Sequence, residues 1–491
     1  MSVSRRSLLA SLVAAPVVLA QSTSDWVPLF DGKTLNGWKE SGGSHSFRVV
    51  DGAIAADGPR AHLFYDGPIR GHEFSNFELK VEVMTRPLCN SGVFFHTHYQ
   101  ADGFPAEGFE VQVNNSALGE GTYRERKKTG SLYGVSNVYK SFARDDEWFP
   151  MHVVVRGKRV QISVSGLLLV DFVEPDPPVK AEPGRGRVLG GGTFALQCHD
   201  PGSKALFRNI VVRPLADSDS DKSSPPVVDE TWRELLALGA KNYPVVDYHV
   251  HLKGGLTLDN ALRESRRTGI QYGIAVNCGK LFPVSDDAGA REFLNSMKRQ
   301  PAFVAMQAEG REWVTMFSKE TIAQFDYVFT DSMTWTDDNG RRMRTWIKEE
   351  VGEIAEPQKF MDMLVKRIEW IYDHEPVDIY ANPTFLPDVI APRYDELWTR
   401  ERMERVVDAL RRNGVAMELN NRYRLPSAAF VKMAKAAGVK FSFGTNNTDA
   451  NLGRCEYGLQ MIRECDLKWQ DFFVPKPDGE KPIQTRGLPR A

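Results

Sequence analysis

The stretch ADSDSDKSSPPVVDE, residues 216–230, divides the 491-residue chain into two parts with different hydrophobic patterns. It is polar, acidic, rich in serine and interrupted by proline, which is the composition of a linker. We therefore expect one domain over residues 24–215 and a second domain over residues 231–491. The length of 491 residues also favours several domains, because a single hydrophobic core rarely grows that large.

Before the linker, the chain consists of short runs in which apolar and polar residues alternate. Turn residues separate these runs, and none of the segments has a clear helical periodicity, so the pattern predicts an antiparallel β-sandwich. The expected strands are FELKVEVMT (77–85), SGVFFHTHY (91–99), GFEVQVNN (108–115), MHVVVRG (151–157), RVQISVSG (159–166), LLLVDFV (167–173), TFALQC (193–198) and FRNIVVRPL (207–215).

After the linker, apolar strands alternate with amphipathic helical segments such as ERMERVVDALRRNG (401–414). Seven such alternations predict a parallel α/β barrel, distorted from the common eight-stranded TIM form. The expected strands are PVVDYHV (244–250), QYGIAVNC (271–278), AFVAMQAEG (302–310), DYVFTDS (326–332), VDIYANP (377–383), VAMELNN (415–421) and KFSFGTNN (440–447).

The charge balance excludes some classes of partner. Lys and Arg number 62 and Asp and Glu number 64, so nothing draws this chain to nucleic acid or to an anionic membrane surface. Residues 1–20 combine Arg5 and Arg6 with an apolar run and small residues, which predicts an export signal and a periplasmic or secreted protein. The SRRSLLA context resembles a twin-arginine signal, and a general secretory signal is the equal alternative. We expect no membrane anchor, and the sequence carries no signal for the oligomeric state.

The motif DYHVHL, residues 247–252, places two histidines at the end of the first barrel strand. Residues i and i+2 of a strand face the same way, so His249 and His251 could point into one site. Glu309 and Asp331 follow later strands, and polar residues end six of the seven. This ring is a candidate site for one divalent ion, zinc, manganese or iron, held by His249, His251, and Glu309 or Asp331 with amide oxygens or water. For any single residue, the turn-forming habit of Asn and Asp is the simpler explanation.

With DYHVHL and the stretch GVAMELNNRYRLPSAAFVKMAKAAGVKFSFGTNN (414–447), the second domain resembles the polymerase-and-histidinol-phosphatase (PHP) metal-dependent hydrolases. The resemblance implies a metal-binding barrel, with Asn446 at the place of the family's final aspartate. Thr448 stands where the last histidine of the family belongs, and His374 is the one further histidine, so the full trinuclear site cannot be built. A reduced catalytic site and a barrel that binds without hydrolysing both stay open.

The first domain resembles the 3-keto-disaccharide hydrolase family, also described as 3-keto-glucoside lyase/hydratase domains. The resemblance begins at WVPLFDGKTLNGWK (26–39), runs through the strands above, and ends at FALQCHDPGSKALFRNIVVRPL (194–215). It implies a concanavalin A-like β-sandwich and a 3-keto-glycoside substrate.

In GFEVQVNN, strand alternation places Phe109, Val111 and Val113 toward the core and Glu110, Gln112 and Asn114 on the opposite face. One carboxylate does not suffice for ordinary glycoside hydrolysis, which uses two. A 3-keto sugar removes that need, because the ketone makes the C2 proton acidic. One base can then form an enolate, the C1 group leaves, and water adds back.

Glu110 is the expected base or acid. His96 and His98, alternate residues in FFHTH, are candidates for the partner acid or a metal pair, and a solvent-facing position on the strand is the equal alternative. The residues expected to hold the sugar or the enolate are Gln112, Asn114, Lys127, Tyr133, Gln197 and His199.

Three interpretations follow. The leading one is an exported carbohydrate-active enzyme whose sandwich cleaves 3-keto-glycosides by elimination and hydration. The second places metal-dependent hydrolysis in the barrel and makes the sandwich a sugar-binding module. The third is a non-catalytic carbohydrate-binding protein.

Overall fold

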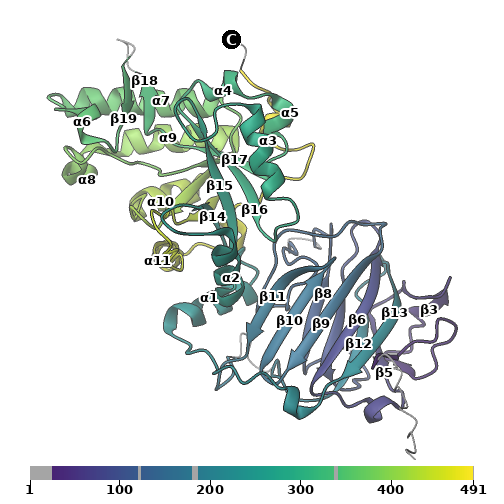
Figure 1. The fold of residues 1–491 in the computed structure, drawn as a ribbon. Helices are drawn as coiled ribbons and strands as arrows, with labels where there is room; N and C mark the ends of the chain where they lie inside the picture. Colours follow the sequence, from purple (N-terminus) through teal and green to yellow (C-terminus); the bar gives the residue numbers. More distant parts are fainter. Residues whose placement is uncertain (1–24, 120–122, 180–185, 337–340, 490–491) are drawn as a thin grey trace, which may run out of the picture.

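The chain folds into a β-sandwich followed by an α/β barrel, as the two sequence patterns predict (Figure 1). The computed structural model describes residues 25–119, 123–179, 186–336 and 341–489. The expected export signal at residues 1–20 lies outside the described residues. None of the helices in the described ranges combines the length and the apolar composition of a membrane span.

Two antiparallel sheets form the sandwich. One runs in the order β11-β10-β9-β6-β13-β4-β3, with β1 paired to β13, and the other runs β2-β5-β12-β7-β8. The strands are β1 (Val27–Pro28), β2 (Trp38–Glu40), β3 (Phe47–Val50), β4 (Ala53–Ala56), β5 (Ala61–Tyr65), β6 (Phe77–Thr85), β7 (Ser91–Thr97), β8 (Phe109–Val113), β9 (Phe149–Arg156), β10 (Arg159–Val164), β11 (Leu167–Val173), β12 (Thr193–Cys198) and β13 (Ala205–Pro214).

The sandwich core lies between the two sheets. Along each strand, every second side chain points into this core. Phe109, Val111 and Val113 of β8 are buried in this core. Glu110 and Gln112 therefore face the outer side of the five-stranded sheet, as predicted. On that outer side, Phe64, Phe94 and Ala195 form a small separate apolar cluster.

Seven parallel strands close into the barrel in the order β14-β15-β16-β17-β20-β21-β22, which confirms the predicted seven-stranded barrel. The barrel strands are β14 (Val246–His251), β15 (Gln271–Gly279), β16 (Phe303–Glu309), β17 (Tyr327–Thr330), β20 (Ile379–Tyr380), β21 (Ala416–Asn420) and β22 (Phe441–Gly444). A short hairpin, β18 (Thr334–Thr336) and β19 (Arg342–Arg344), is an addition that the sequence pattern did not predict. The PHP identity of this barrel stays a prediction.

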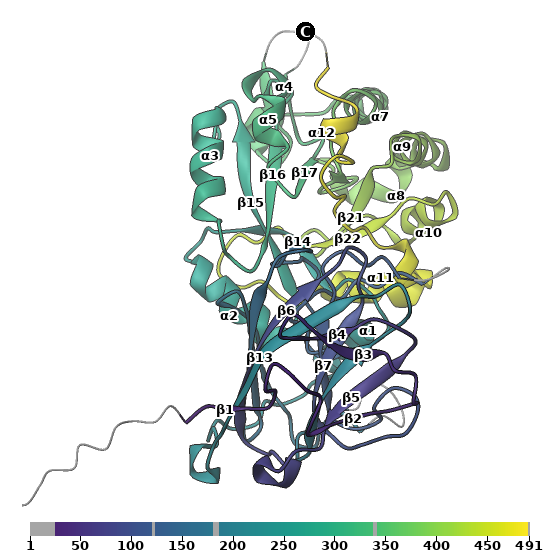
Figure 2. The same ribbon diagram turned by 90° about the vertical axis from the view of Figure 1, so that its right-hand side faces the viewer.

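Helices surround the barrel strands on their outer side (Figure 2). Their ends follow ordinary capping rules: Thr257 and Thr399 accept hydrogen bonds at the N-termini of α2 and α9, and Gly269 and Gly414 end the same helices in the left-handed conformation. The helices are α1 (Glu230–Ala240), α2 (Leu258–Thr268), α3 (Asp287–Ser296), α4 (Trp313–Met316), α5 (Lys319–Ile322), α6 (Lys348–Val351), α7 (Pro357–His374), α8 (Tyr394–Leu397), α9 (Arg400–Asn413), α10 (Ala428–Ala436), α11 (Glu456–Cys465) and α12 (Pro482–Thr485).

Helix α1 joins the two domains, because its buried side chains divide between both cores. Trp232 and Leu236 pack in the sandwich core, whereas Leu235 and Leu238 pack in the barrel core. The linker before α1 also contacts the sandwich, where Arg159 pairs with Asp221 at 2.7 Å.

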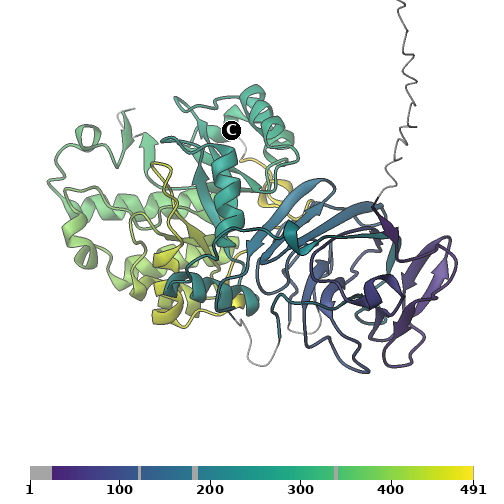
Figure 3. The same ribbon diagram turned by 60° about the horizontal axis from the view of Figure 1, so that its bottom comes forward.

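The sandwich packs against the barrel (Figure 3). Two contacts show that it covers the end of the barrel at which the strands begin. The backbone N–H of Tyr139 donates to Gln271 Oε1, at the start of β15, at 2.8 Å. Lys140 Nζ lies 2.6 Å from Asp326 Oδ2, just before β17. The polar ends of the barrel strands therefore lie at the opposite end of the barrel from the sandwich.

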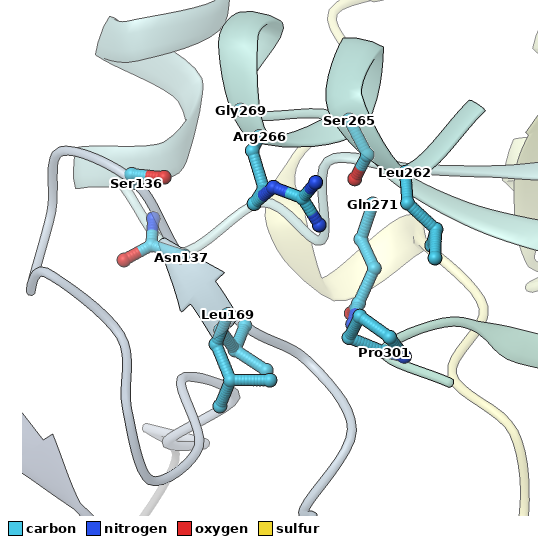
Figure 4. A pocket seen from close by; sticks show the side chains of 10 residues that line it. Ser136, Asn137, Leu169, Leu262, Ser265, Arg266, Gly269, Gln271 and Pro301 are labelled. Atoms are coloured by element: carbon cyan, nitrogen blue, oxygen red, sulfur yellow. The ribbon is translucent and has the colours of Figure 1, made fainter. Parts of the chain in front are cut away.

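Between the domains remains a small crevice, in which Asn137 and Leu169 of the sandwich face Arg266, Gln271 and Pro301 of the barrel (Figure 4). Its volume is about 20 Å³. This space suits about one water molecule and not a sugar.

Candidate functional site

A cleft of about 710 Å³ opens on the outer face of the five-stranded sheet. Outward-pointing side chains of β7, β8 and β12 contribute to it, and loops complete its walls. Cavities of this size accommodate small organic ligands. The lining residues are Pro87, Leu88, Asn90, Phe94, Phe104, Pro105, Glu110, Gln112, Ala117, Leu118, Gly119, Tyr123, Glu125, Tyr133, Arg187, Gln197, His199, Asp200 and Gly202.

Glu110 is a buried carboxylate on the cleft surface of β8, with 7% of the residue exposed. Gly92 on the neighbouring strand β7 makes room for it, because a Cβ at Gly92 would lie 2.5 Å from Glu110 Oε1. The amide of Gln112 lies beside this carboxylate. In one amide orientation its nitrogen is 3.2 Å from Glu110 Oε1, and in the other it donates to Asn90 Oδ1 at 3.0 Å.

A second buried carboxylate, Glu125, reaches the cleft from the irregular segment after β8. Its Oε2 accepts hydrogen bonds from Tyr123 at 2.8 Å and from Tyr133 at 3.1 Å. Its Oε1 accepts from the backbone N–H of Lys127 at 2.9 Å. Burial, reinforced by the charge of Glu125, raises the pKa of both phenols, so both remain hydrogen-bond donors at neutral pH.

Two cations flank the ring of Tyr133. Lys127 Nζ lies 4.6 Å and Arg187 Cζ 5.3 Å from the ring centroid. Lys127 is itself 1% exposed, and its Nζ lies 3.8 Å from Glu125 Oε1. Buried charges need such partners, so this group of two cations, a carboxylate and an aromatic ring is a built polar wall of the cleft.

His199 and Asp200 form a pair at another part of the cleft wall. His199 Nδ1 lies 2.8 Å from Asp200 Oδ2. Burial raises the pKa of the Asp200 carboxyl, but hydrogen bonds from Ser203, His199 and Gly202 outweigh burial and lower the pKa below its usual value. Asp200 is therefore ionised and accepts the Nδ1 proton, which leaves Nε2 of His199 for other partners.

Gln197 of β12 lines the cleft next to a buried histidine of β5. Gln197 Nε2 lies 3.4 Å from His62 Nε2. Burial, with the positive charge of Arg60, lowers the pKa of His62 to about 3, so the ring is neutral. Gln197 Oε1 has no hydrogen-bond partner among the described residues, so it can accept one from a ligand hydroxyl.

The structure brings together Glu110, Gln112, Tyr133, Gln197 and His199 of the predicted set at one cleft. Lys127 lies behind Tyr133. Asn114 instead shapes a turn, because its Oδ1 accepts from the backbone N–H of Ala117 at 2.8 Å and its Nδ2 donates to the Lys127 carbonyl at 3.1 Å.

The predicted histidine pair does not lie on the cleft wall. His96 has φ 54°, which breaks the alternation, and β7 ends at Thr97. His96 Nε2 bonds the Ser75 carbonyl at 2.9 Å, whereas His98 is exposed and lies 2.9 Å from Glu107. His96 and His98 therefore do not form a pair on one face of β7, and neither of them lines the cleft that contains Glu110. Their roles as partner acid or metal pair stay a prediction that this geometry does not favour.

Sequence reasoning missed three charged residues of the cleft: Glu125, Arg187 and Asp200. Glu125 stands in TYRERKK, where a run of charges indicates a solvent-exposed loop. Asp200 directly follows His199, and this His-Asp neighbourhood was the available signal. Arg187 reaches the cleft from a segment without strand or helix pattern.

In the barrel, the predicted metal-binding residues lie at buried strand ends and bond to other protein groups. His249 Nδ1 lies 2.6 Å from Glu418 Oε1, and His249 Nε2 lies 3.2 Å from Gln307 Oε1. His251 Nδ1 bonds the Ala275 carbonyl at 3.1 Å. Both rings, with centroids 5.1 Å apart, thus have protein partners.

The two predicted carboxylates of the barrel are also hydrogen-bonded. Glu309 Oε1 accepts from Asn277 at 2.8 Å and from Gln307 at 2.9 Å, and Asp331 Oδ2 accepts from Asn382 at 3.0 Å. Burial, followed by the nearby charge of Asp331, raises the pKa of Glu309 to about 8.

This arrangement does not fit a metal ion as it stands. Within the described residues, no group of three or more His, Cys, Asp and Glu side chains is arranged to hold one. Amide donors occupy carboxylate oxygens that a metal would need. The zinc, manganese or iron site at His249, His251, Glu309 and Asp331 stays a prediction, and no reaction step is assigned to it.

Residues 25–213 match the 3-keto-alpha-glucoside-1,2-lyase-like domain family, which covers the sandwich. A 3-keto-disaccharide hydrolase from Bacteroides thetaiotaomicron is 35% identical over 77 residues. That match covers 14% of this chain and 27% of the relative, so the chain spans about a quarter of the relative's length. The sandwich is therefore similar in sequence to 3-keto-alpha-glucoside-1,2-lyase-like domains.

Solved structures with a similar first domain include carbohydrate-related proteins. A candidate glycosyl hydrolase from Parabacteroides distasonis is 23% identical, covers 39% of this chain and 94% of its own, and has a TM-score of 0.33. The carbohydrate-binding module CBM66 from Bacillus subtilis is 14% identical, covers 36% of this chain and 95% of its own, and has a TM-score of 0.25. At these scores the likenesses carry no functional argument.

Proposed function

We propose that the sandwich cleft cleaves 3-keto-glycosides by elimination and hydration, with net hydrolysis of the glycosidic bond. The observation that carries the proposal is the position of Glu110: a buried carboxylate in a sugar-sized cleft, within the residues that match the lyase-like family. The carbohydrate-related role of the domain family supports the choice of substrate class.

In this reaction Glu110 removes the acidic proton at C2 of the sugar, and the electron pair forms an enolate with the oxygen at C3. The enolate re-forms the ketone while the C1–O bond breaks, and the leaving oxygen takes a proton. Water then adds to C1 and a proton returns to C2, which restores the 3-keto sugar. One base, one acid and donors for the enolate oxygen suffice.

His199 is the proposed partner acid in place of His96 and His98. Asp200 fixes the Nδ1 proton of His199, so its protonated ring would present Nε2–H to the leaving oxygen. Gln112 and Gln197 are the proposed ligands of the enolate oxygen and the sugar hydroxyls. Amide groups suit both tasks, since they donate and accept hydrogen bonds.

The presence of Glu125 favours one second candidate, conventional hydrolysis by two carboxylates. Glu110 and Glu125 line the same cleft, so the single-carboxylate argument from β8 alone no longer excludes it. Against this candidate, three donors already surround the Glu125 carboxylate. Its oxygens thus serve the protein wall, and elimination remains the better-supported reaction.

The two candidates predict different substrates. The full chain is incubated with a 3-keto-glucoside and with the unoxidised parent glucoside, in D2O, beside enzyme-free controls. Elimination predicts turnover of the ketone alone, with deuterium at C2 of the product above the enzyme-free level. Equal cleavage of both sugars would establish conventional hydrolysis, and a protein that leaves the ketone intact would contradict the proposal.

Glu110→Gln is the matched variant, because it keeps the shape of the side chain and removes the base. We expect its kcat on the ketone to fall by about 100-fold or more, which is the usual scale for a general base. Wild-type rates in this variant would remove Glu110 from the mechanism.

A further inference from the structure

The cleft wall that contains Glu125 and Tyr133 rests on the barrel, although all the cleft residues belong to the sandwich. We call residues 123–133 the wall segment. It follows β8 along the chain. Residues that come more than a hundred positions later, in the second part of the chain, contact it near Lys127. The central contact is Asn242, which lies between α1 and β14 and is 3% exposed.

Asn242 holds the wall segment on both sides of Glu125. Its Nδ2 donates to the carbonyl of Arg124, and its Oδ1 accepts from Lys127 Nζ at 3.3 Å. Asn242 has φ 68°, a left-handed conformation that asparagine adopts more readily than most residues. The left-handed backbone and the two amide contacts therefore both favour asparagine at this position.

Lys127 carries this contact toward the cleft. Its ammonium group is buried beside Glu125 and the ring of Tyr133. Burying an ammonium group is costly unless polar partners surround it. Asn242 Oδ1 is such a partner for Lys127, and because it is neutral it does not compete with the Glu125 carboxylate for the lysine charge. The position of Lys127 relative to Glu125 and Tyr133 therefore depends on a residue outside the sandwich.

A second barrel residue, Trp469, supports the same segment. The ring of Tyr123 meets the Trp469 ring edge-on, with centroids 6.1 Å apart. Arg126 Cζ lies 5.2 Å from the centroid of the Trp469 ring. Residues on both sides of Glu125 thus contact one tryptophan of the barrel.

We propose that the barrel completes the sugar site, with Asn242 as a positioning residue that acts through Arg124 and Lys127 on Glu125 and Tyr133. The inference rests on the proposed function of the cleft and deepens it, because it assigns the barrel a part in that reaction. Asn242 touches no substrate in this scheme. It fixes the wall against which the keto sugar binds.

The test uses Asn242→Gly in the full chain, because glycine keeps the left-handed backbone and removes both amide contacts. We expect kcat on the 3-keto-glucoside to fall by about 10-fold or more, a loss of roughly 1.4 kcal/mol in transition-state stabilisation. Lys140→Met is the matched control, since it breaks another contact between the domains, to Asp326, without touching the wall segment. Its kcat should stay within about 2-fold of wild type.

A double-mutant cycle separates positioning from general stability. If Asn242 acts through Lys127, adding Asn242→Gly to the Lys127→Met variant should lower kcat by a much smaller factor than Asn242→Gly does in the wild-type protein. Asn242→Asp keeps an acceptor for Lys127 and should recover part of the lost rate. Fully additive losses, or a wild-type kcat in Asn242→Gly, would overturn the inference.

Hydrogen exchange tests the inference without any substrate. The amide of Lys127 donates to Glu125 Oε1, so its exchange reports the order of the wall segment. Asn242→Gly should speed this exchange by about 10-fold or more relative to Lys140→Met. Equal protection overturns the positioning role, even if turnover succeeds. A wild-type protein that leaves the ketone intact, with the exchange difference present, contradicts only the proposed function.

Discussion

At the scale of single residues, the position of Glu110 in the cleft depends on the room that a neighbouring glycine leaves as much as on polar contacts. Glu110 lies over a glycine, and a neighbouring amide reaches its carboxylate. Strand alternation predicted the shared face of Glu110 and Gln112 correctly, because β8 is regular. It failed for His96, whose left-handed backbone breaks the alternation, and it could not find Glu125, which lies in an irregular segment.

Gly92→Ala should impair the site without removing any polar group. The new Cβ would lie 2.5 Å from Glu110 Oε1, so the carboxylate must move. We expect kcat on the 3-keto-glucoside to fall by about 10- to 100-fold, since misplacement of about 1 Å can cost that much. Gly190→Ala is the control, because no atom of the described residues lies within 4 Å of the Cβ that this substitution adds. Equal rates in the two variants would show that Glu110 tolerates displacement.

His96 should make the stability of the protein depend on pH. Burial lowers the pKa of His96 from 6.5 to about 4, so the unfolded chain binds the proton more readily. The stabilisation is complete above pH 6.5 and is lost as the pH falls toward 4, by about 3 kcal/mol in total.

Chemical denaturation between pH 7 and pH 4 measures this dependence. His96→Gln should flatten the decline of the unfolding free energy, whereas substitution of the exposed His72 by Gln should leave it unchanged. A decline of the same steepness in His96→Gln would assign the pH dependence to other groups.

At the scale of elements, the barrel strands end in a connected polar network. His249 of β14 pairs with Glu418 of β21, and Gln307 of β16 joins His249 to Glu309. The sequence predicted all seven strands and these polar ends, because apolar runs and turn residues mark both. It could not predict which side chains bond to one another, since that depends on strand order and on side-chain direction inside the closed barrel.

Removing one partner of the buried His249–Glu418 pair should destabilise the barrel. We expect His249→Ala to lower the free energy of unfolding by about 3 to 5 kcal/mol, because the Glu418 carboxylate would stay buried without its partner. Denaturant unfolding in the presence and absence of a chelator provides the measurement, with elemental analysis of both proteins.

The chelator arm decides between a hydrogen-bonded network and a metal site. If the network alone stabilises the strand ends, the chelator should leave the wild-type midpoint unchanged. A clear loss of wild-type stability with chelator, together with a stoichiometric metal that His249→Ala lacks, would restore the predicted metal site.

At the scale of the whole molecule, the two domains are connected by side-chain packing and by an ion pair as well as by the linker. Helix α1 places side chains in both cores, and Lys140 pairs with Asp326 across the interface. The sequence predicted the division into two domains from composition. It could not predict their contacts, because the contacting residues lie far apart in the chain and carry no common pattern.

We expect the two domains to unfold together. Loss of either domain exposes buried side chains of α1 and breaks the interface, so neither core melts independently. Calorimetry of the full chain should show one endotherm, with a calorimetric enthalpy equal to the van't Hoff enthalpy. Two resolved endotherms would show that the interface is too weak to couple the cores.

The mainly exposed stretch 216–229 has a different consequence for the intact protein. A protease should cut there first, because the chain is accessible and lies outside regular strands and long helices. The cut product should nevertheless migrate as one particle on gel filtration, since α1 stays attached to the barrel fragment while Trp232 and Leu236 remain inserted in the sandwich. The two halves would then stay associated without a covalent connection, because α1 of the barrel fragment remains packed in the sandwich core.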